Sequence, residues 1–164
     1  FYIANLGEEA IAGKTHRYFE QLKDYGEKQG IRVVGFFGKV EAEVKELEKE
    51  EQESFLREMG IEQSGLAEVI KTGKEILELI TFYTAVGGKE LRNWLIPKGT
   101  TAIKAAGKIH SDFEAGFIKA EVIKIDDFIK AGGESEARRL GLVSVQGKEY
   151  VVEDGDVIHF RFKI

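Results

Sequence analysis

The sequence predicts an α/β segment followed by an α+β domain, with the boundary close to residue 80. Residues 1–80 alternate strand-like and helix-like patterns, which is typical of a parallel sheet with helical crossovers. From residue 81 onward apolar residues recur with a period of two, as in half-buried strands. Residues 1–80 carry 17 acidic and 11 basic side chains, whereas residues 81–164 carry 12 and 13. We therefore expect two domains, 1–80 and 81–164.

The first domain is expected to hold two buried strands, at 1–5 and 31–37. Helical patterns follow at 15–28 (capped by Thr15), at 41–59, and from a cap at Ser64 onward. The run from Glu41 to Glu53 has seven Glu and two Lys and is expected to form a solvated helix face. Two strands do not complete a sheet and residue 1 opens directly on a strand, so we expect the chain to be a piece of a longer protein.

The second domain begins with a hairpin of strands 80–85 and 90–96 around a glycine turn at 86–89. A helix over 102–109 is expected, capped by Thr100 or Thr101, followed by a polar connection in which Gly116 is able to take a positive φ. The remaining elements are a strand from 117, short helices or turns at 126–131 and 134–140, and strands at 148–152 and 158–164. Two strands, a helix and further strands favour a β-grasp fold.

Composition excludes several classes of site. There is no Cys, which rules out disulfides and thiolate metal sites, and no apolar run long enough to span a membrane. His16, His110 and His159 lie far apart without carboxylates at ligand spacing, so no metal site is expected. His110 and Asp112 are expected to organise a turn by local hydrogen bonds, the alternative being a ligand-contacting loop. The protein is expected in the cytoplasm, with no membrane or DNA partner.

Several motifs of the second half resemble the TGS domain of the YchF group of Obg-like ATPases. They are Tyr83-Thr84-Ala85, Lys89–Trp94, Lys98-Gly99-Thr100, Gly107–Val122, Asp126-Asp127-Phe128, Gly132-Gly133-Glu134 and Gly147–Ile158. The resemblance covers residues 80–164, and more loosely 1–80 as the distal part of a P-loop nucleotide-binding domain. It implies a parallel-sheet C-terminal half of that domain, followed by a β-grasp (ubiquitin-like) TGS domain.

The segment after the first strand, Asn5-Leu6-Gly7-Glu8, is similar to the base-reading motif of P-loop GTPases. There an Asn braces neighbouring loops and an Asp accepts two hydrogen bonds from guanine. Here Leu6 replaces the Lys of that motif and Glu8 replaces the Asp, and the YchF group has a similar Asn-x-x-Glu and prefers ATP. The resemblance implies base contacts from Asn5, Leu6 and Glu8, whereas the four residues alone would also fit a strand-end turn with a solvated Glu.

The loop after the second strand, around Gly38 and Lys39, lies where the family's last nucleotide-contacting loop would lie. The alternative is a plain strand-to-helix connection. Gly13-Lys14-Thr15 is not a phosphate-binding loop, because the motif would need Gly where Glu8 stands. Without that loop nothing holds the β- and γ-phosphates or Mg²⁺, so the 164-residue chain alone is expected to be inactive, with the Mg²⁺ ligands outside it.

The resemblance therefore implies part of a ribosome-associated enzyme that binds and hydrolyses ATP, or GTP, when intact. The alternative is a non-catalytic RNA- or ligand-binding module. The final strand would place His159, Arg161 and Lys163 on one face, where basic side chains can contact RNA phosphates. A solvated sheet surface is the other interpretation of that face, and the loop at His110 is the second candidate for an RNA contact.

Overall fold

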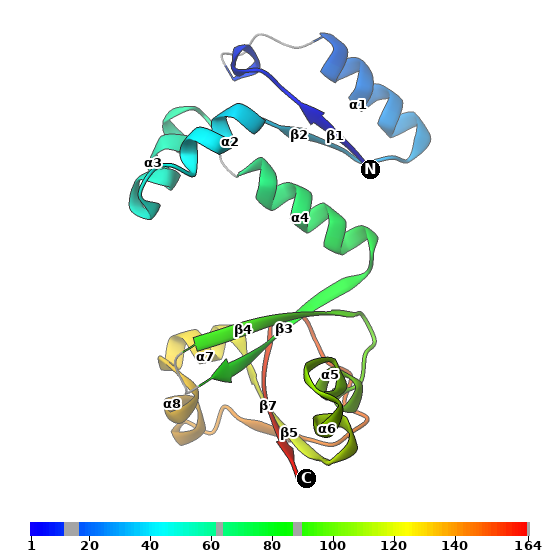
Figure 1. Cartoon of the computed structure of the whole chain (residues 1–164), viewed down its shortest axis with the longest axis vertical. Coiled ribbons are helices and arrows are strands. Elements are labelled where there is room, and N and C mark those ends of the chain that lie inside the picture. The colour runs from blue at the N-terminus through cyan, green and yellow to red at the C-terminus, as the bar shows by residue number, and fades with distance from the viewer. Residues whose placement is uncertain (12–16, 62–63, 87–89, 164) are drawn as a thin grey trace. The chain divides into compact units, whose positions relative to one another are not determined.

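The computed structural model describes residues 1–11, 17–61, 64–86 and 90–163. The expected cap at Thr15, the segment Gly13-Lys14-Thr15, His16 and the turn at 87–89 lie outside the described residues. The chain divides into two compact units, Phe1–Glu75 (unit 1) and Ile76–Ile164 (unit 2) (Figure 1). Within the described ranges no helix is long and apolar enough to cross a membrane.

Unit 1 is built on two parallel strands, β1 (Tyr2–Asn5) and β2 (Val33–Phe36), which confirms the expected parallel pairing. The register runs from Tyr2↔Val33 to Asn5↔Phe36, so both strands end at the same edge. The helical segments of this unit are η1 (Glu8–Ala10), α1 (Arg17–Gln29), α2 (Gly38–Val44), α3 (Lys49–Glu58) and α4 (Gly65–Ile76). Its buried apolar side chains are contributed by β2 and α2, from Val34, Val40 and Val44.

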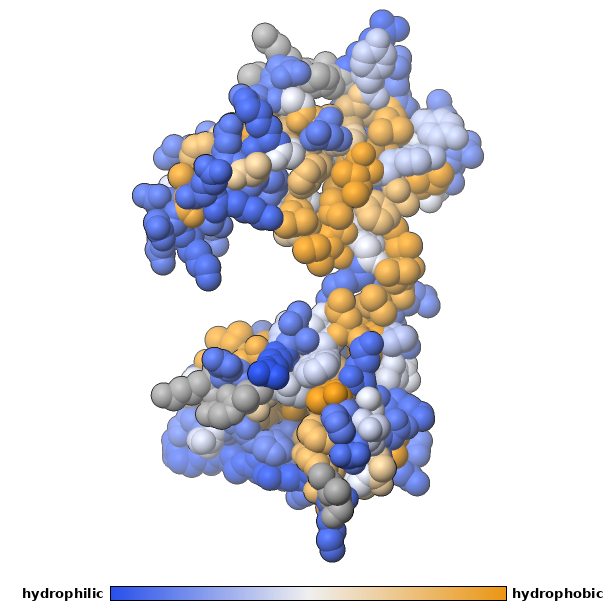
Figure 2. Space-filling model, viewed as in Figure 1, coloured by the Kyte–Doolittle hydropathy of each residue, from blue (hydrophilic) through white to orange (hydrophobic). Residues whose placement is uncertain are grey.

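Two expectations for unit 1 are wrong. The first strand is not buried: Ile3 is 51% exposed, because β1 pairs only with β2 in the described part of the chain. The helix expected over 41–59 is two helices, since Glu48 adopts an extended conformation between α2 and α3. The apolar stripe of α4 is also largely exposed, including Ile70, and apolar side chains gather on the visible surface of unit 1 (Figure 2).

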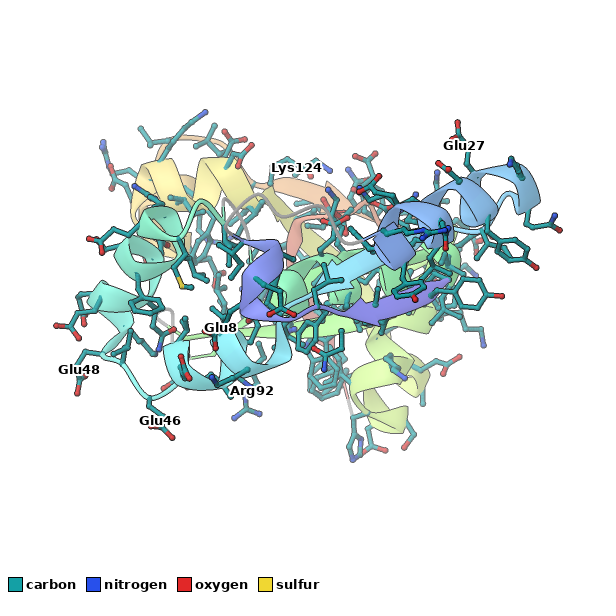
Figure 3. The ribbon with its side chains drawn as sticks, turned by 90° about the horizontal axis from the view of Figure 1, so that it is seen from above. Glu8, Glu27, Glu46, Glu48, Arg92 and Lys124 are labelled. Atoms are coloured by element: carbon teal, nitrogen blue, oxygen red, sulfur yellow. The ribbon has the colours of Figure 1, made fainter. Side chains whose placement is uncertain are left out.

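The acidic run is a solvated surface with one exception. Glu46 and Glu48 project away from the ribbon (Figure 3), whereas Glu41 on α2 is only 9% exposed. The Glu41 carboxylate accepts hydrogen bonds from the Gly65 backbone N–H (2.5 Å) and the Ser64 hydroxyl (2.7 Å). Ser64 therefore acts as a donor to Glu41, and Glu41 satisfies the first amide of α4, whose free N–H groups and dipole favour a carboxylate.

Unit 2 is one five-stranded sheet with helices on both faces (Figure 1). The strand order is β4-β3-β7-β5-β6, in which β3 and β7 are parallel and the other pairs antiparallel. The strands are β3 (Leu79–Val86), β4 (Glu90–Pro97), β5 (Phe117–Lys124), β6 (Ser144–Gln146) and β7 (Asp156–Phe162). The helices are α5 (Ala102–Ile109), α6 (Ser111–Ala115), α7 (Ile125–Ala131) and α8 (Glu134–Arg139).

Alternation along the strands builds two separate cores. One face of the sheet packs Phe82, Ile96 and Phe160 against the small residues of α5. The opposite face packs Ile123 and Val157 under α7 and α8. The only Trp of the sequence, Trp94, packs against the first core with its ring stacked 6.4 Å from Phe82, so its fluorescence reports on unit 2.

One local expectation for unit 2 is also wrong. Residues 148–152 form no strand beyond a single bridge at Val151, because the carbonyls of Lys148 and Tyr150 accept from the first amides of α5. Gly116 has φ −95° and needs no left-handed conformation. A side chain is excluded at Gly116 because a Cβ there would overlap the carbonyl oxygen of Lys163, whose backbone N–H donates to the Gly116 carbonyl.

A fully buried carboxylate, Asp156, fixes the start of β7. It binds Lys124 Nζ (2.6 Å) and accepts from the Tyr150 hydroxyl (2.8 Å) and the Glu153 backbone N–H (2.9 Å). Burial, followed by the hydrogen bond to Asp156, raises the pKa of Tyr150 to about 12. These contacts satisfy the carboxylate and tie the loop before β7 to the end of β5.

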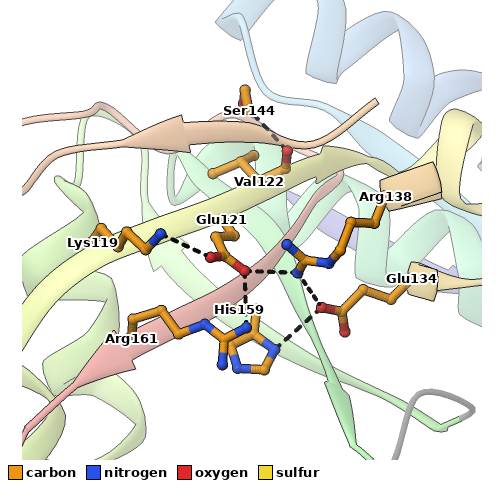
Figure 4. A network of polar contacts seen from close by, with 8 residues as sticks. All are labelled: Lys119, Glu121, Val122, Glu134, Arg138, Ser144, His159 and Arg161. Carbon is orange, nitrogen blue, oxygen red and sulfur yellow. Dashed lines mark hydrogen bonds and ion pairs between the residues drawn. The ribbon is translucent and has the colours of Figure 1, made fainter. Parts of the chain in front are cut away.

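A second carboxylate, Glu121, joins β5, β7 and α8 (Figure 4). Its side chain is 7% exposed and contacts Arg138 Nη2 (2.7 Å), Arg161 Nη2 (3.1 Å) and Lys119 Nζ (3.1 Å). The hydrogen bond from Arg138, with weaker ones from Arg161 and Lys119, outweighs desolvation and lowers the pKa of Glu121 to about 2.

Because the folded pKa lies below the ordinary value of 4.5, the stability from Glu121 is present above that value and is lost as pH falls toward 2. Glu121→Gln should destabilise unit 2 by about 1–2 kcal/mol at pH 7, allowing for the solvent exposure of its partners. The difference from wild type should shrink between pH 4.5 and 2. Urea unfolding followed by Trp94 fluorescence measures it.

The matched control is Glu136→Gln, an exposed carboxylate on α8 that pairs with Arg139. It should leave the free energy of unfolding close to that of wild type at each of these pH values. A Glu121→Gln deficit that stays constant down to pH 2 would show that the carboxylate charge contributes nothing.

Candidate functional site

The carboxyl edge of the β1–β2 pair gathers the residues expected to contact a nucleotide base. Asn5 ends β1, and β2 ends one residue before Phe37, which directly precedes α2. The Leu6 backbone N–H donates to the Phe36 carbonyl (2.7 Å), so the chains stay paired for one residue past β1. Parallel strands bring their carboxyl-end loops together, and such edges are where open α/β sheets bind ligands.

Asn5 links the two loops directly. Its side-chain Oδ1 accepts a hydrogen bond from the Gly38 backbone N–H (3.1 Å), the first amide of α2. The residue before the helix, Phe37, makes no side-chain cap, so Asn5 supplies the capping oxygen from the neighbouring strand. The hydrogen bond connects the loops after β1 and β2, whereas a contact of Asn5 with a base stays a prediction.

Glu8 and Lys39 also meet at this edge. Glu8 Oε1 lies 2.7 Å from Lys39 Nζ, and Lys39 lies 3.9 Å from Glu43. The hydrogen bond to Glu8 raises the pKa of Lys39, with further contributions from the charges of Glu8 and Glu43. Figure 3 labels Glu8 beside α2. Both side chains are exposed enough to reach a ligand, so the pair is a weak, solvent-screened contact that can be exchanged for a new partner.

Glycine residues allow the segments at this edge to approach one another closely. A Cβ on Gly38 would lie 3.1 Å from Asn5 Oδ1, and a Cβ on Gly35 would lie 3.1 Å from Leu6 Cδ1. Leu6 is half-buried against β2 and does not project as a free side chain. Gly65, at the start of α4, would place its Cβ 3.3 Å from the Gly35 carbonyl. The helix that Glu41 caps is therefore held against the same edge.

Unit 1 also has a cavity of 510 Å³ between α2, α3 and α4, away from the loops that follow β1 and β2. Its lining includes Glu41, Gln52, Arg57 and Leu66, but none of the five expected base contacts. Sequence reasoning missed Glu41, whose place in an acidic run predicted exposure. The sequence feature that could have indicated its burial is its position, one turn into the helix that follows β2 and directly after the buried Val40.

Of the unit 2 residues expected to contact RNA, two are paired with carboxylates of the same unit. Arg161 and His159 do lie on one face of β7, but Arg161 pairs with Glu121 and His159 Nδ1 lies 3.4 Å from Glu134 (Figure 4). Lys163 lies one residue beyond β7 and is exposed. Two of the three basic groups therefore face buried or half-buried carboxylates of their own unit.

His110 lies apart from that face, between α5 and α6. Its Nδ1 accepts from the Asp112 backbone N–H (3.1 Å), so it caps α6 in the local manner expected for the turn. Over the described ranges, no three His, Cys, Asp or Glu residues cluster as a metal site would require.

A family model matches residues 79–163, more than half of the chain: YchF-GTPase_C, described as "Protein of unknown function (DUF933)". A ribosome-binding ATPase YchF from Pasteurella multocida is 46% identical over 99% of this chain. Obg-like ATPase 1 from Rattus norvegicus is 44% identical over 98% of the chain. The chain spans 44% and 41% of these two proteins, respectively.

A solved structure agrees with these matches. The Schizosaccharomyces pombe YchF GTPase superposes on 98% of this chain with a TM-score of 0.83 and 30% identity, covering 43% of that protein. The similarity therefore extends across both units and not only across the part matched by the family model. On this evidence, the chain belongs to the YchF family of Obg-like ATPases.

Proposed function

We propose that the chain is the C-terminal portion of a ribosome-associated nucleoside triphosphatase that binds ATP, or GTP, with the base at the carboxyl edge of β1 and β2. The observation that carries the proposal is the hydrogen bond from Gly38 to Asn5, which joins two expected base-contacting loops. Support comes from relatives named ribosome-binding ATPase and Obg-like ATPase. Phosphate binding and hydrolysis belong to sequence beyond these 164 residues.

The geometry suits recognition of a planar ring. Asn5 fixes the spacing between the two loops, and the half-buried Leu6 offers an apolar surface at the end of β1. The Glu8 carboxylate can accept a hydrogen bond from the exocyclic amino group of a base, and Lys39 holds that carboxylate near the opposite loop. A base would replace an exposed ion pair whose loss costs little.

The Glu8–Lys39 pair also bears on which base is bound. Guanine offers two adjacent N–H donors to one carboxylate, whereas adenine offers its amino group. A carboxylate placed one methylene further out and tethered by Lys39 is poorly placed for the two-donor contact. We therefore assign adenine as the preferred base.

Unit 2 is proposed to be a β-grasp domain of the TGS type, with the domain boundary near residue 80. The order β4-β3-β7-β5-β6, with the last strand central and parallel to the first, supports this assignment. The proposal places the protein in the cytoplasm, at the ribosome. Mg²⁺ would accompany the phosphates and would be held by residues outside this chain.

Within unit 2, Lys163 is the basic residue best placed to contact ribosomal RNA. It is exposed and lies at the end of the strand, whereas Arg161 already neutralises the buried Glu121. His159 faces Glu134 on α8. A phosphate contact is therefore assigned to Lys163, with Arg161 contributing less than its position in the sequence implies.

Glu8→Asp in the full-length protein should shift the ratio of GTP to ATP affinity toward GTP by about tenfold. The shorter carboxylate leaves Lys39 and matches the guanine-reading position, where a two-donor contact is worth about 1–3 kcal/mol in base readout. Dissociation constants for both nucleotides, measured by equilibrium dialysis, give the ratio.

Glu9→Asp is the control, since it makes the same change in the neighbouring residue of η1. It should leave the GTP-to-ATP ratio unchanged. An unchanged ratio in Glu8→Asp as well would mean that Glu8 does not read the base, and the site assignment would fail at that residue.

Lys163→Gln should weaken ribosome binding and reduce its dependence on salt by about one phosphate contact. Arg161→Gln should have a smaller effect on the salt slope, because its charge is held by Glu121. Ribosome co-sedimentation across a salt series, with Lys130→Gln on α7 as control, measures both. Equal curves for Lys163→Gln and Lys130→Gln would remove this end of β7 from the ribosome contact.

A further inference from the structure

β3 and β7, the two parallel neighbours in the sheet of unit 2, separate along their length. The pairing of β3 with β7 covers only Phe82↔Asp156 and Tyr83↔Val157. Beyond that point β3 continues to Val86 and β7 to Phe162, and the two ribbons diverge (Figure 4). The outer side of each strand stays paired, β3 with β4 and β7 with β5. Among the described residues, the two edges that face this split have no strand partner.

A cavity lies on one face of the sheet at the split and a crevice on the other. The larger, of 290 Å³, is lined by residues of β3, β4, β7 and the α5–α6 pair. On the α8 side there is only a crevice of about 10 Å³. Ala85, Ile158 and His159 line both, which places the split between them. The larger cavity therefore lies where β3 and β7 are no longer paired.

The larger cavity has an aromatic lining with a polar rim. Trp94, Phe113 and Phe162 contribute ring surface, and Phe113 and Phe162 stack with centroids 3.9 Å apart. The Trp94 indole N–H donates to the Thr84 hydroxyl (3.0 Å), so the polar atom of that ring is satisfied inside the unit. Arg92, exposed on β4, supplies a positive charge at the rim.

We propose that this split is a docking site for an extended peptide segment of a partner protein, with an apolar anchor residue flanked by acidic residues. The segment adds as a strand along the open edge of β7, from Ile158 to Phe162. Its anchor enters the aromatic cavity, and an acidic neighbour two residues away on the same face meets Arg92.

Three physical constraints favour this occupant. An open strand edge presents backbone N–H and C=O groups that another extended chain can satisfy, which is the basis of strand addition. Side chains of an added strand alternate, so one face enters the aromatic cavity while the other faces the polar network of Glu121 and Glu134. The volume lies at the lower limit of small-molecule sites, about 300–1,000 Å³, and suits one anchoring side chain better than a cofactor.

The test uses the full-length protein and a fluorescein-labelled nonapeptide with Glu two and four residues on either side of a central Phe and Thr at the positions between. Fluorescence anisotropy should show saturable binding, and the β7 amides should gain protection from hydrogen exchange. Arg92→Glu should weaken binding about three- to tenfold. Lys98→Glu, an exposed charge reversal just past β4 and outside the cavity lining, should change it by less than about twofold.

Two N-methylated peptides separate strand addition from simple hydrophobic contact. Each blocks an alternate set of backbone N–H groups and keeps every side chain. A strand on one edge uses only one set, so one peptide should lose about tenfold or more in affinity and the other less than about threefold. Equal effects of the two peptides, or no saturable binding of the parent peptide, overturn the proposal.

A single-stranded nucleic acid would instead stack its bases on the rings of Trp94, Phe113 and Phe162. If a labelled oligouridylate binds in a manner lost in Arg92→Glu while the peptide does not bind, the cavity is a base-stacking site and the peptide proposal is wrong. Near-ultraviolet circular dichroism of Arg92→Glu matching wild type ensures that a loss of binding is not a loss of fold.

Discussion

The proposed nucleotide site depends on one hydrogen bond, from the Gly38 N–H to the side-chain oxygen of Asn5. Parallel pairing of β1 and β2 brings the two strand ends to one edge, but it does not fix the loops that follow them. Asn5 does so by capping α2 from the neighbouring strand, which leaves Glu8 and Lys39 facing one another at 2.7 Å. The proposed base-binding surface therefore rests on two loops that are remote in sequence and are joined by the Asn5 hydrogen bond together with the Glu8–Lys39 pair.

Three other carboxylates with little solvent exposure also join elements that are remote in sequence. They are Glu41 in unit 1 and Glu121 and Asp156 in unit 2. In unit 1, Glu41 ties α2 to the start of α4, where few apolar side chains are buried in the described part. In unit 2, Glu121 and Asp156 join strands of a sheet that already has a core on each face. Replacing Glu41 should therefore loosen the edge that carries the site, whereas Glu121 acts on the stability of the other unit.

Periodicity was sufficient to predict most elements, including the β3–β4 hairpin and the short helices α7 and α8. It failed where tertiary contacts override local pattern. Residues 148–150 look like a strand but serve as hydrogen-bond acceptors for α5, and Gly116 is required by the nearby Lys163 carbonyl rather than by its own φ. The motif Asn5–Glu8 was visible in the sequence, but its pairing with Gly38 and Lys39 could come only from the register of β1 on β2.

The most direct test of the central claim is photocrosslinking of 8-azidoadenosine triphosphate to the full-length protein, with the labelled peptides mapped by mass spectrometry. The azide sits on the adenine ring, so it marks the residues that surround the base. We expect labels within residues 5–8 and 37–39, lost when unlabelled ATP competes and reduced in Asn5→Ala but not in Asn93→Ala. Labelling confined to unit 2, or unaffected by Asn5→Ala, would contradict the placement of the base at the β1–β2 edge.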